Sequence, residues 1–349
     1  MNEIHILMFG GKRCGKTTVL SSMYAESSKA LDGAPLKLIL DDKKTEDSLS
    51  FAAASIKEKM EMFRSPLTRV EVDDNPSIGE KVYSFILSVE GGNRIPFCIH
   101  DIPGEWLEDD HMEDVKALVE KSQIIMIAID TPYLFSKMTI KGYGDYHEEY
   151  NKPLMIANFF KNSISVQALA NRMILFVPIK CERYYHLTYS QQLNIYDRNY
   201  MEELVDAISA GYQDLLLYLR STPELYNNCT LAITPILSAG GIDFVRFRTD
   251  EETGRLVSLY QEPEFLPDDE KGYSPRFCEQ PMLYALIHIL KQTRAENPAA
   301  VRFFWGRGLN RRQLENLDAA IETLRQKIKR NSGVHAEDGY YIIQNPMGI

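Results

Sequence analysis

The sequence has few of the features that mark disulfide-rich, zinc-binding or membrane-embedded proteins. Its five cysteines are odd in number and form no C-x-x-C pair, and its seven histidines contain no H-E-x-x-H motif. This scarcity argues against a disulfide framework and a structural zinc site, and it favours a reducing compartment. The cysteine and histidine spacing therefore predicts no site for a transition metal.

Long apolar runs and an excess of positive charge are also missing. No run approaches 18 apolar residues, so we expect no membrane span. The opening "MNEIHILMFG" has no basic leader, which predicts a cytoplasmic protein. A net charge of −10 disfavours broad binding to nucleic acid or anionic membranes. The 349 residues suffice for one large domain or two ordinary ones.

A glycine-rich stretch stands between an apolar run and a helical pattern. "IHILMF" (4–9) is typical of a buried parallel strand, "GGKRCGKT" fits G-x-x-x-x-G-K-[ST], and "TVLSSMYAESSK" has helical spacing. Glycines let successive N–H groups point at phosphate oxygens, and the following helix adds positive potential. The alternative is a β–α turn with an exposed lysine. The residues expected to bind the nucleotide here are Gly10, Gly11, Lys12, Arg13, Cys14, Gly15, Lys16, Thr17 and Thr18.

Two residues of this loop leave alternatives open. Arg13 either supplies a positive charge to the phosphates or faces solvent. Cys14 either has a lowered pKa at the helix N-terminus or is a small residue packed under the loop.

A second motif follows the strand pattern "IPFCIHD". Asp101 and Gly104 match D-x-x-G, and the preceding pattern "KVYSFILSVEGGN" predicts the first strand of a hairpin. An aspartate at the carboxyl end of a parallel strand lies beside the phosphate loop, where it can hold Mg²⁺ through water. The alternative is a plain turn between strand and helix.

In this order, the motifs resemble the TRAFAC class of P-loop GTPases. Within that class, "DIPGEW", the strand end "VPIKCE" and the long insertions resemble the bacterial double-GTPase families of predicted conflict and defence systems. The resemblance covers about residues 1–295. It implies an α/β P-loop fold whose mostly parallel sheet has one antiparallel edge strand and helices on both faces. It also implies GTP/GDP and Mg²⁺ as cofactors, and a protein partner, often another GTPase.

The resemblance also implies guanine-reading residues at two later strand ends. Lys180 and Glu182 follow "MILFVPI" in the place of N/T-K-x-D, with Ile179 and Glu182 departing from that pattern, and Ser238 and Ala239 match S-A-K/L. The stem of Lys180 is expected on the purine face, the Glu182 carboxylate on the guanine edge, and the Ala239 N–H at O6. An ATP-binding protein is the alternative.

The resemblance implies hydrolysis by positioning and charge stabilisation. Expected catalytic residues are Lys16, Gly104, Glu105 and Arg13, and expected Mg²⁺ ligands are Thr17, Asp101 and Thr68, with Ser77 a rival to Thr68. Glu105 stands where small GTPases have a glutamine, so we expect slow intrinsic turnover. A nucleotide-binding scaffold with little hydrolysis is a further alternative.

We expect residues 1–295 to form one domain with insertions at about 30–80, 131–150, 183–200 and 241–278, and residues 296–349 to form a helical extension. The first insertion predicts an amphipathic helix at about 45–63, and the fourth a small hairpin. Asn310 is the expected N-cap of a helix with an apolar seam from Leu314 to Ile328. That helix either lies on the domain itself or binds a partner protein. The switch insertion is the other candidate surface for a partner. The basic residues of the helix predict a solvated face rather than nucleic-acid binding.

Overall fold

The computed structural model describes residues 3–11, 14–61, 70–73, 79–90, 93–107, 111–135, 146–191, 200–249, 251, 256–296, 310–328 and 340–349. Within these ranges no helix combines the length and the apolar character needed to cross a membrane.

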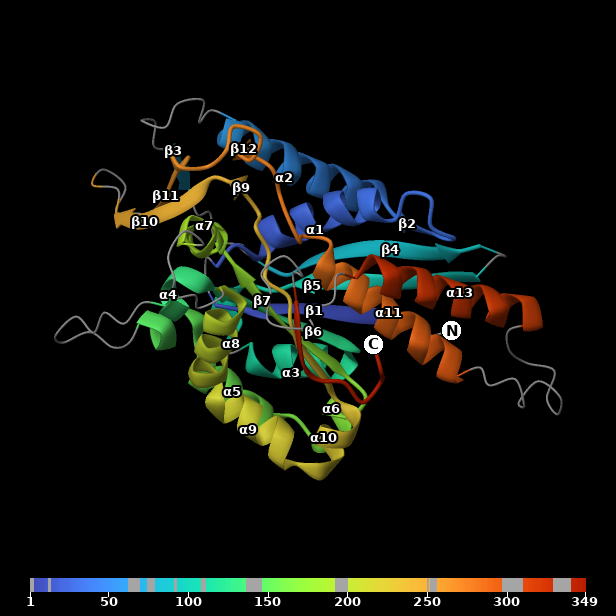
Figure 1. Ribbon diagram of the computed structural model, residues 1–349. Helices are drawn as coiled ribbons and strands as arrows, with labels where there is room; N and C mark the ends of the chain where they lie inside the picture. Colours follow the sequence, from blue (N-terminus) through green and yellow to red (C-terminus); the bar gives the residue numbers. More distant parts are fainter. Residues whose placement is uncertain are drawn as a thin grey trace.

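A central sheet of eight strands organises the chain (Figure 1). Its order is β13 (Tyr341–Gln344), β8 (Thr230–Ile233), β7 (Met173–Ile179), β6 (Ile124–Asp130), β1 (Ile4–Gly10), β5 (Asn93–Asp101), β4 (Lys81–Val89) and β2 (Leu36–Leu40). The five strands from β8 to β5 are parallel. Parallel strands are covered by helices on both faces of a sheet, and the near-continuous apolar sequence of these strands suits that burial. The predicted α/β class with a mostly parallel sheet is confirmed.

The prediction of a single antiparallel strand at the edge is wrong. The hairpin of β4 and β5 forms as expected, but β2 pairs antiparallel with β4 and takes the edge position. At the opposite edge β13 pairs antiparallel with β8, so the segment after residue 296 contributes a strand as well as a helix. The sequence pattern "YIIQ" is short, and nothing local distinguishes it from a loop.

Helices cover both faces of the sheet (Figure 1). One face carries α1 (Lys16–Ala30), α11 (Gln280–Glu296) and α13 (Arg311–Lys327). The other carries α3 (Met112–Lys121), α5 (Pro153–Ser163), α6 (Val166–Leu169), α8 (Tyr200–Gly211), α9 (Gln213–Ser221) and α10 (Pro223–Asn228). Each face buries its own apolar cluster, because alternate residues of every strand point to opposite sides.

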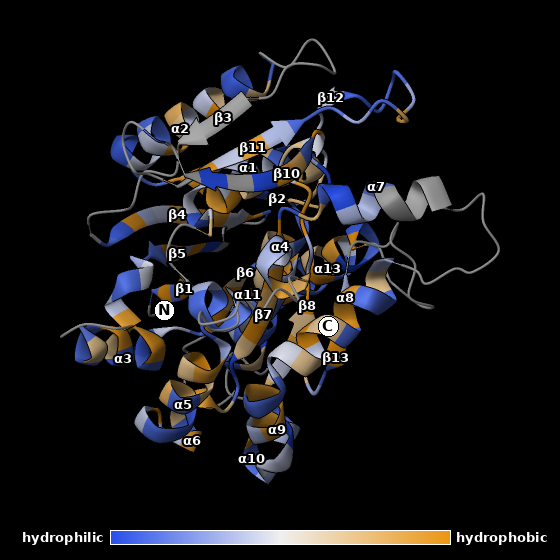
Figure 2. Cartoon of the chain, turned by 90° about the vertical axis from the view of Figure 1, so that its left-hand side faces the viewer, coloured by the Kyte–Doolittle hydropathy of each residue, from blue (hydrophilic) through white to orange (hydrophobic). Residues whose placement is uncertain are grey.

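The insertions build a smaller layer above α1. It contains α2 (Lys43–Glu61), a three-stranded sheet of β3 (Val70–Asp73), β11 (Leu256–Gln261) and β10 (Asp243–Thr249), and the short pair β9 (Gly240–Gly241) and β12 (Gly272–Tyr273). Figure 2 shows α2, β10 and β11 together on one side of the central sheet. Met60, Phe244 and Tyr260 bury one another there. The predicted helix and hairpin are confirmed.

Three short helical segments follow strands β5 and β6 along the chain: η1 (Gly104–Leu107), α4 (Thr131–Phe135) and η2 (His147–Asn151). Helix α7 (Glu182–Gln191) follows β7.

The apolar seam of α13 packs against the chain's own core. Asn310 caps the helix in a capping box with Gln313, as the sequence predicts. Leu317 and Leu324 are buried in the same cluster as α11, and Leu314 is also buried. The structure thus supports a helix lying on its own domain, and the seam offers no free surface to a partner.

We expect Leu317→Ala to lower the free energy of unfolding by about 2–5 kcal/mol, because a fully buried leucine leaves a cavity when truncated. Chemical denaturation measures this loss. Glu322→Ala, an exposed change on the same helix, is the control. Equal stability of both variants would mean that α13 is not part of the cooperative core.

Candidate functional site

The loop between β1 and α1 adopts a glycine-dependent turn. Gly15 is the N-cap of α1 and has φ 95°, a left-handed conformation that favours glycine. A Cβ at Gly11 would lie 1.7 Å from the carbonyl oxygen of Tyr150 in η2, so only glycine fits. Gly10 ends β1. Lys12 and Arg13 lie outside the described residues, so both alternatives for Arg13, a charge on the phosphates or a position in solvent, stay open.

Lys16 folds back over this loop. Its Nζ donates to the carbonyl oxygens of Gly10 (3.2 Å) and Gly11 (3.0 Å), and the side chain is buried. Among the described residues its hydrogen-bond partners are these two backbone carbonyls, so the ammonium group points into the loop. An anion in the loop would therefore meet a positive charge that is already in place.

Thr17 and Asp101 meet beside the loop. Thr17 Oγ1 donates to Asp101 Oδ2 at 2.8 Å. Asp101 is fully buried, and its Oδ1 has no hydrogen-bond partner among the described residues. Burial raises the pKa of this carboxyl, against the opposing effects of Lys16 and Thr17. A hydroxyl and an orphaned carboxylate oxygen are ligands that Mg²⁺ prefers, so these residues fit that ion.

The third predicted magnesium ligand is not placed. Thr68 and its rival Ser77 both lie outside the residues that the structure describes.

Lys180 forms a buried ion pair rather than standing alone. Its Nζ lies 2.7 Å from Asp130 Oδ2 and 5.4 Å from the centre of the Phe244 ring. Burial raises the pKa of Asp130, and the neighbouring ammonium opposes that rise. Lys180 has φ 56°, so the chain turns sharply where β7 ends. The sequence analysis did not identify Asp130, although this residue ends a buried strand as Asp101 does.

Glu182, Ser238 and Ala239 come together, as their positions at strand ends predict. Glu182 Oε1 accepts from the Ala239 N–H at 2.8 Å and from Ser238 Oγ at 3.4 Å. Glu182 is fully buried, and burial raises its pKa to about 7. Its Oε2 finds no partner in the described part of the chain. The Ala239 N–H, expected to meet a guanine O6, is already engaged by Glu182.

A cavity of about 250 Å³ extends from the loop to Lys180, after the end of β7, and to Ser238. Its lining combines Cys14, Gly15, Thr17 and Thr18 with Ile179, Lys180 and Ser238, and its opposite wall contains Phe51, Ile56 and Met60 of α2 and Tyr260 of β11. Phe51 is 77% exposed although it is aromatic. The sequence predicts the helix but not its place in the wall. An aromatic residue on the polar side of an amphipathic helix is the signal that could have indicated it.

Gly104 and Glu105 begin η1, shortly after Asp101; Gly104 is buried and Glu105 is half-buried.

Cys14 is buried, and burial raises the pKa of its thiol. The alternative of a lowered Cys14 pKa is therefore wrong, and the packed small residue is correct.

Asn151 is a positioning residue that the sequence analysis missed. Its Oδ1 accepts from the Asp130 N–H at 2.8 Å, and its Nδ2 donates to the Asp130 carbonyl at 3.0 Å. These bonds fasten η2 to the end of β6, beside Gly11.

The chain matches no model of a protein family, and it matches none of the curated proteins.

Proposed function

We propose that this chain is a Mg²⁺-dependent GTP-binding protein that hydrolyses GTP slowly and acts as a regulatory switch. The observation that carries the proposal is the meeting of Thr17 and Asp101, at 2.8 Å, beside a glycine-shaped loop that holds the buried Lys16. Mg²⁺, when bound, would neutralise phosphate charge and orient the phosphates. Thr17 and Asp101 would hold the ion, and Lys16 would bind the phosphate oxygens.

The strand order supports a ligand site at this edge. After β1 the chain forms β2, β4 and β5 on one side of it, and then crosses through α3 to β6 on the other side. The carboxyl end of β1 is therefore a topological switch point, where ligands bind in open α/β sheets. Gly10, Asp101 and Asp130 all end strands at this edge.

Guanine preference is the part of the proposal that Glu182 supports. A buried carboxylate with an orphaned Oε2 suits a base that presents two donors on one edge, as guanine does. Adenine presents no such pair. An ATP-binding protein remains the second candidate, because Ala239 N–H is occupied by Glu182 and Ile179 is apolar.

The experiment that tests the proposal measures GTP and ATP affinities side by side, with and without Mg²⁺, on protein freed of nucleotide. We expect GTP to bind more tightly, and Mg²⁺ to strengthen binding. If neither triphosphate binds, the proposed function is wrong; if ATP binds more tightly, the guanine assignment is wrong.

The preference for GTP over ATP should depend on pH. Glu182 in the nucleotide-free protein has a pKa of about 7, and only the ionised carboxylate accepts both guanine donors. Binding of GTP therefore lowers the pKa of Glu182. The preference for GTP is largest above pH 7, where the free carboxylate is already ionised. Below pH 7 it falls by up to about tenfold per pH unit, because GTP binding must first remove the proton. The measurement is the ratio of the GTP and ATP affinities between pH 5.5 and 8. Protonation of Asp101 would affect both affinities alike, so its effect cancels in this ratio. A ratio that is constant with pH would contradict the role of Glu182.

We expect slow single-turnover hydrolysis by the isolated protein. A carboxylate at Glu105 repels the γ-phosphate and is a poor replacement for a neutral amide that orients water. A partner docking on α2 or self-association would then raise the rate. Measurements across protein concentrations test this; a fast, concentration-independent rate that collapses in Arg13→Ala would mean that the monomer is complete. A triphosphate that binds but is never hydrolysed would favour the scaffold alternative.

A further inference from the structure

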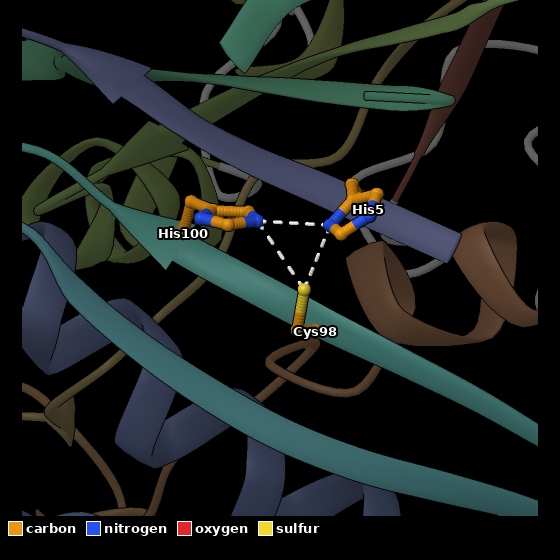
Figure 3. A group of neighbouring side chains, drawn as sticks. All are labelled: His5, Cys98 and His100. Carbon is orange, nitrogen blue, oxygen red and sulfur yellow. Dashed lines mark hydrogen bonds between the residues drawn. The ribbon is translucent and has the colours of Figure 1, made fainter. Parts of the chain in front are cut away.

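Three buried side chains with metal-binding atoms converge on two neighbouring strands (Figure 3). They are His5 of β1 and Cys98 and His100 of β5. His5 and Cys98 are register partners in the parallel ladder, and Cys98 and His100 are two residues apart on one strand. All three side chains therefore point to the same face of the sheet, the one that α3 covers.

The donor atoms form a small triangle. His5 Nδ1 lies 2.9 Å from Cys98 Sγ and 3.0 Å from His100 Nε2, and Cys98 Sγ lies 3.2 Å from His100 Nε2. In a tetrahedral zinc site, with Zn–N near 2.0–2.1 Å and Zn–S near 2.3 Å, such atoms are about 3.4 Å apart. Outward shifts of a few tenths of an ångström would therefore admit an ion above the triangle.

A carboxylate sets the tautomer of His100. Glu80 Oε1 lies 2.5 Å from His100 Nδ1, and a carboxylate can only accept, so Nδ1 donates. In the neutral ring Nε2 then carries the lone pair, and it faces the triangle. A carboxylate behind a histidine is the usual second partner of a metal-binding imidazole, because it fixes the ring and raises its basicity.

We infer that His5, Cys98 and His100 form a binding site for a divalent transition metal, best suited to Zn²⁺. Two imidazoles and a thiolate select zinc over Mg²⁺ and Ca²⁺, which prefer oxygen ligands. On binding, Cys98 loses its thiol proton to solvent, and the metal–sulfur bond forms in its place. The described residues supply three ligands, so a water molecule takes the fourth position.

The site would connect the two strands that carry the proposed nucleotide chemistry. Asp101 follows His100 directly and points to the opposite face, toward Thr17. Glu80 stands just before β4, at the end of the first insertion. A bound ion would thus hold β1, β5 and this insertion together from behind the sheet.

The test uses the full chain, stripped of metal with a chelator and then titrated with Zn²⁺ against a chromogenic chelator, and separately with Co²⁺. We expect one Zn²⁺ per chain, a Co²⁺ complex with a thiolate-to-metal charge-transfer band, and a melting temperature raised by Zn²⁺. Cys98→Ser should abolish the band and the stoichiometric binding. Cys229→Ser, at another buried thiol, is the matched control and should change neither.

A milder variant guards against a folding failure. Glu80→Gln keeps its volume at a half-exposed position and should weaken zinc binding by about 10–100-fold, with its circular dichroism spectrum unchanged. Less than one equivalent of Zn²⁺, a charge-transfer band that survives in Cys98→Ser, or full affinity in Glu80→Gln would overturn the inference. Lys16→Ala should bind zinc as tightly as the original chain does, even if it no longer binds nucleotide. The zinc site and the proposed nucleotide site are therefore tested separately.

Discussion

Replacing Lys16 by alanine should abolish tight binding of nucleoside triphosphates while leaving the fold intact. Lys16 is the buried cation of the loop, and its two present partners are carbonyl oxygens that a phosphate would displace. Each charge-assisted hydrogen bond contributes about 1.5–3 kcal/mol, so losing two weakens binding by at least about 100-fold. Isothermal titration with GTP and Mg²⁺ measures the loss.

The control lies on the same helix. Lys29 lies in the last turn of α1, is exposed, and pairs only with Glu26 among the described residues. Lys29→Ala removes one positive charge from α1 without touching the loop, so its nucleotide affinity should stay unchanged. Folded Lys16→Ala protein that binds GTP as tightly as Lys29→Ala would rule out a phosphate-binding role for the loop.

Replacing Glu182 by glutamine should remove most of the preference for GTP over ATP. The amide keeps an oxygen for the Ala239 N–H, now bonded at 2.8 Å, but its NH₂ group would then face the guanine donors. Two lost hydrogen bonds to a charged acceptor predict a fall of roughly 100-fold in the affinity ratio. Competition between labelled GTP and unlabelled ATP measures the ratio directly.

Two further measurements separate base recognition from stability. Affinity for ATP should change little in Glu182→Gln, since adenine does not use this carboxylate. Glu224→Ala, an exposed change on α10, should leave the ratio as it is. If Glu182→Gln keeps the original ratio, the end of β7 does not read the base.

The sequence predicts the strands around β1 well, because buried parallel strands leave a strong local pattern. "IIMIAID" and "MILFVPI" are apolar without interruption, and each is a buried strand in the structure. The same reasoning places Asp101 and Glu182 at one edge of the sheet. Local sequence says much less about β2 and β13, whose role as edge strands depends on partners far away in the chain.

Side-chain groups assembled across strands are the part that sequence patterns miss. His5 is 93 positions from Cys98, so no spacing motif joins them, and the prediction of no transition-metal site relied on spacing alone. "CIH" contains the only local signal, since a strand puts its first and third residues on one face. The wall that α2 adds to the cavity is also a tertiary feature, because an amphipathic pattern does not say what its polar side will face.

The pairing of β13 with β8 has a consequence for biosynthesis. Gln344 in β13 donates to the carbonyl of Cys229, 115 positions earlier, and β13 completes one edge of the sheet. Until the ribosome has made residues 341–344, the edge of β8 that β13 covers is open and has unpaired backbone groups. Such edges recruit strands from other molecules. A chain released before residue 340 should therefore aggregate even if its proposed nucleotide-binding loop is complete.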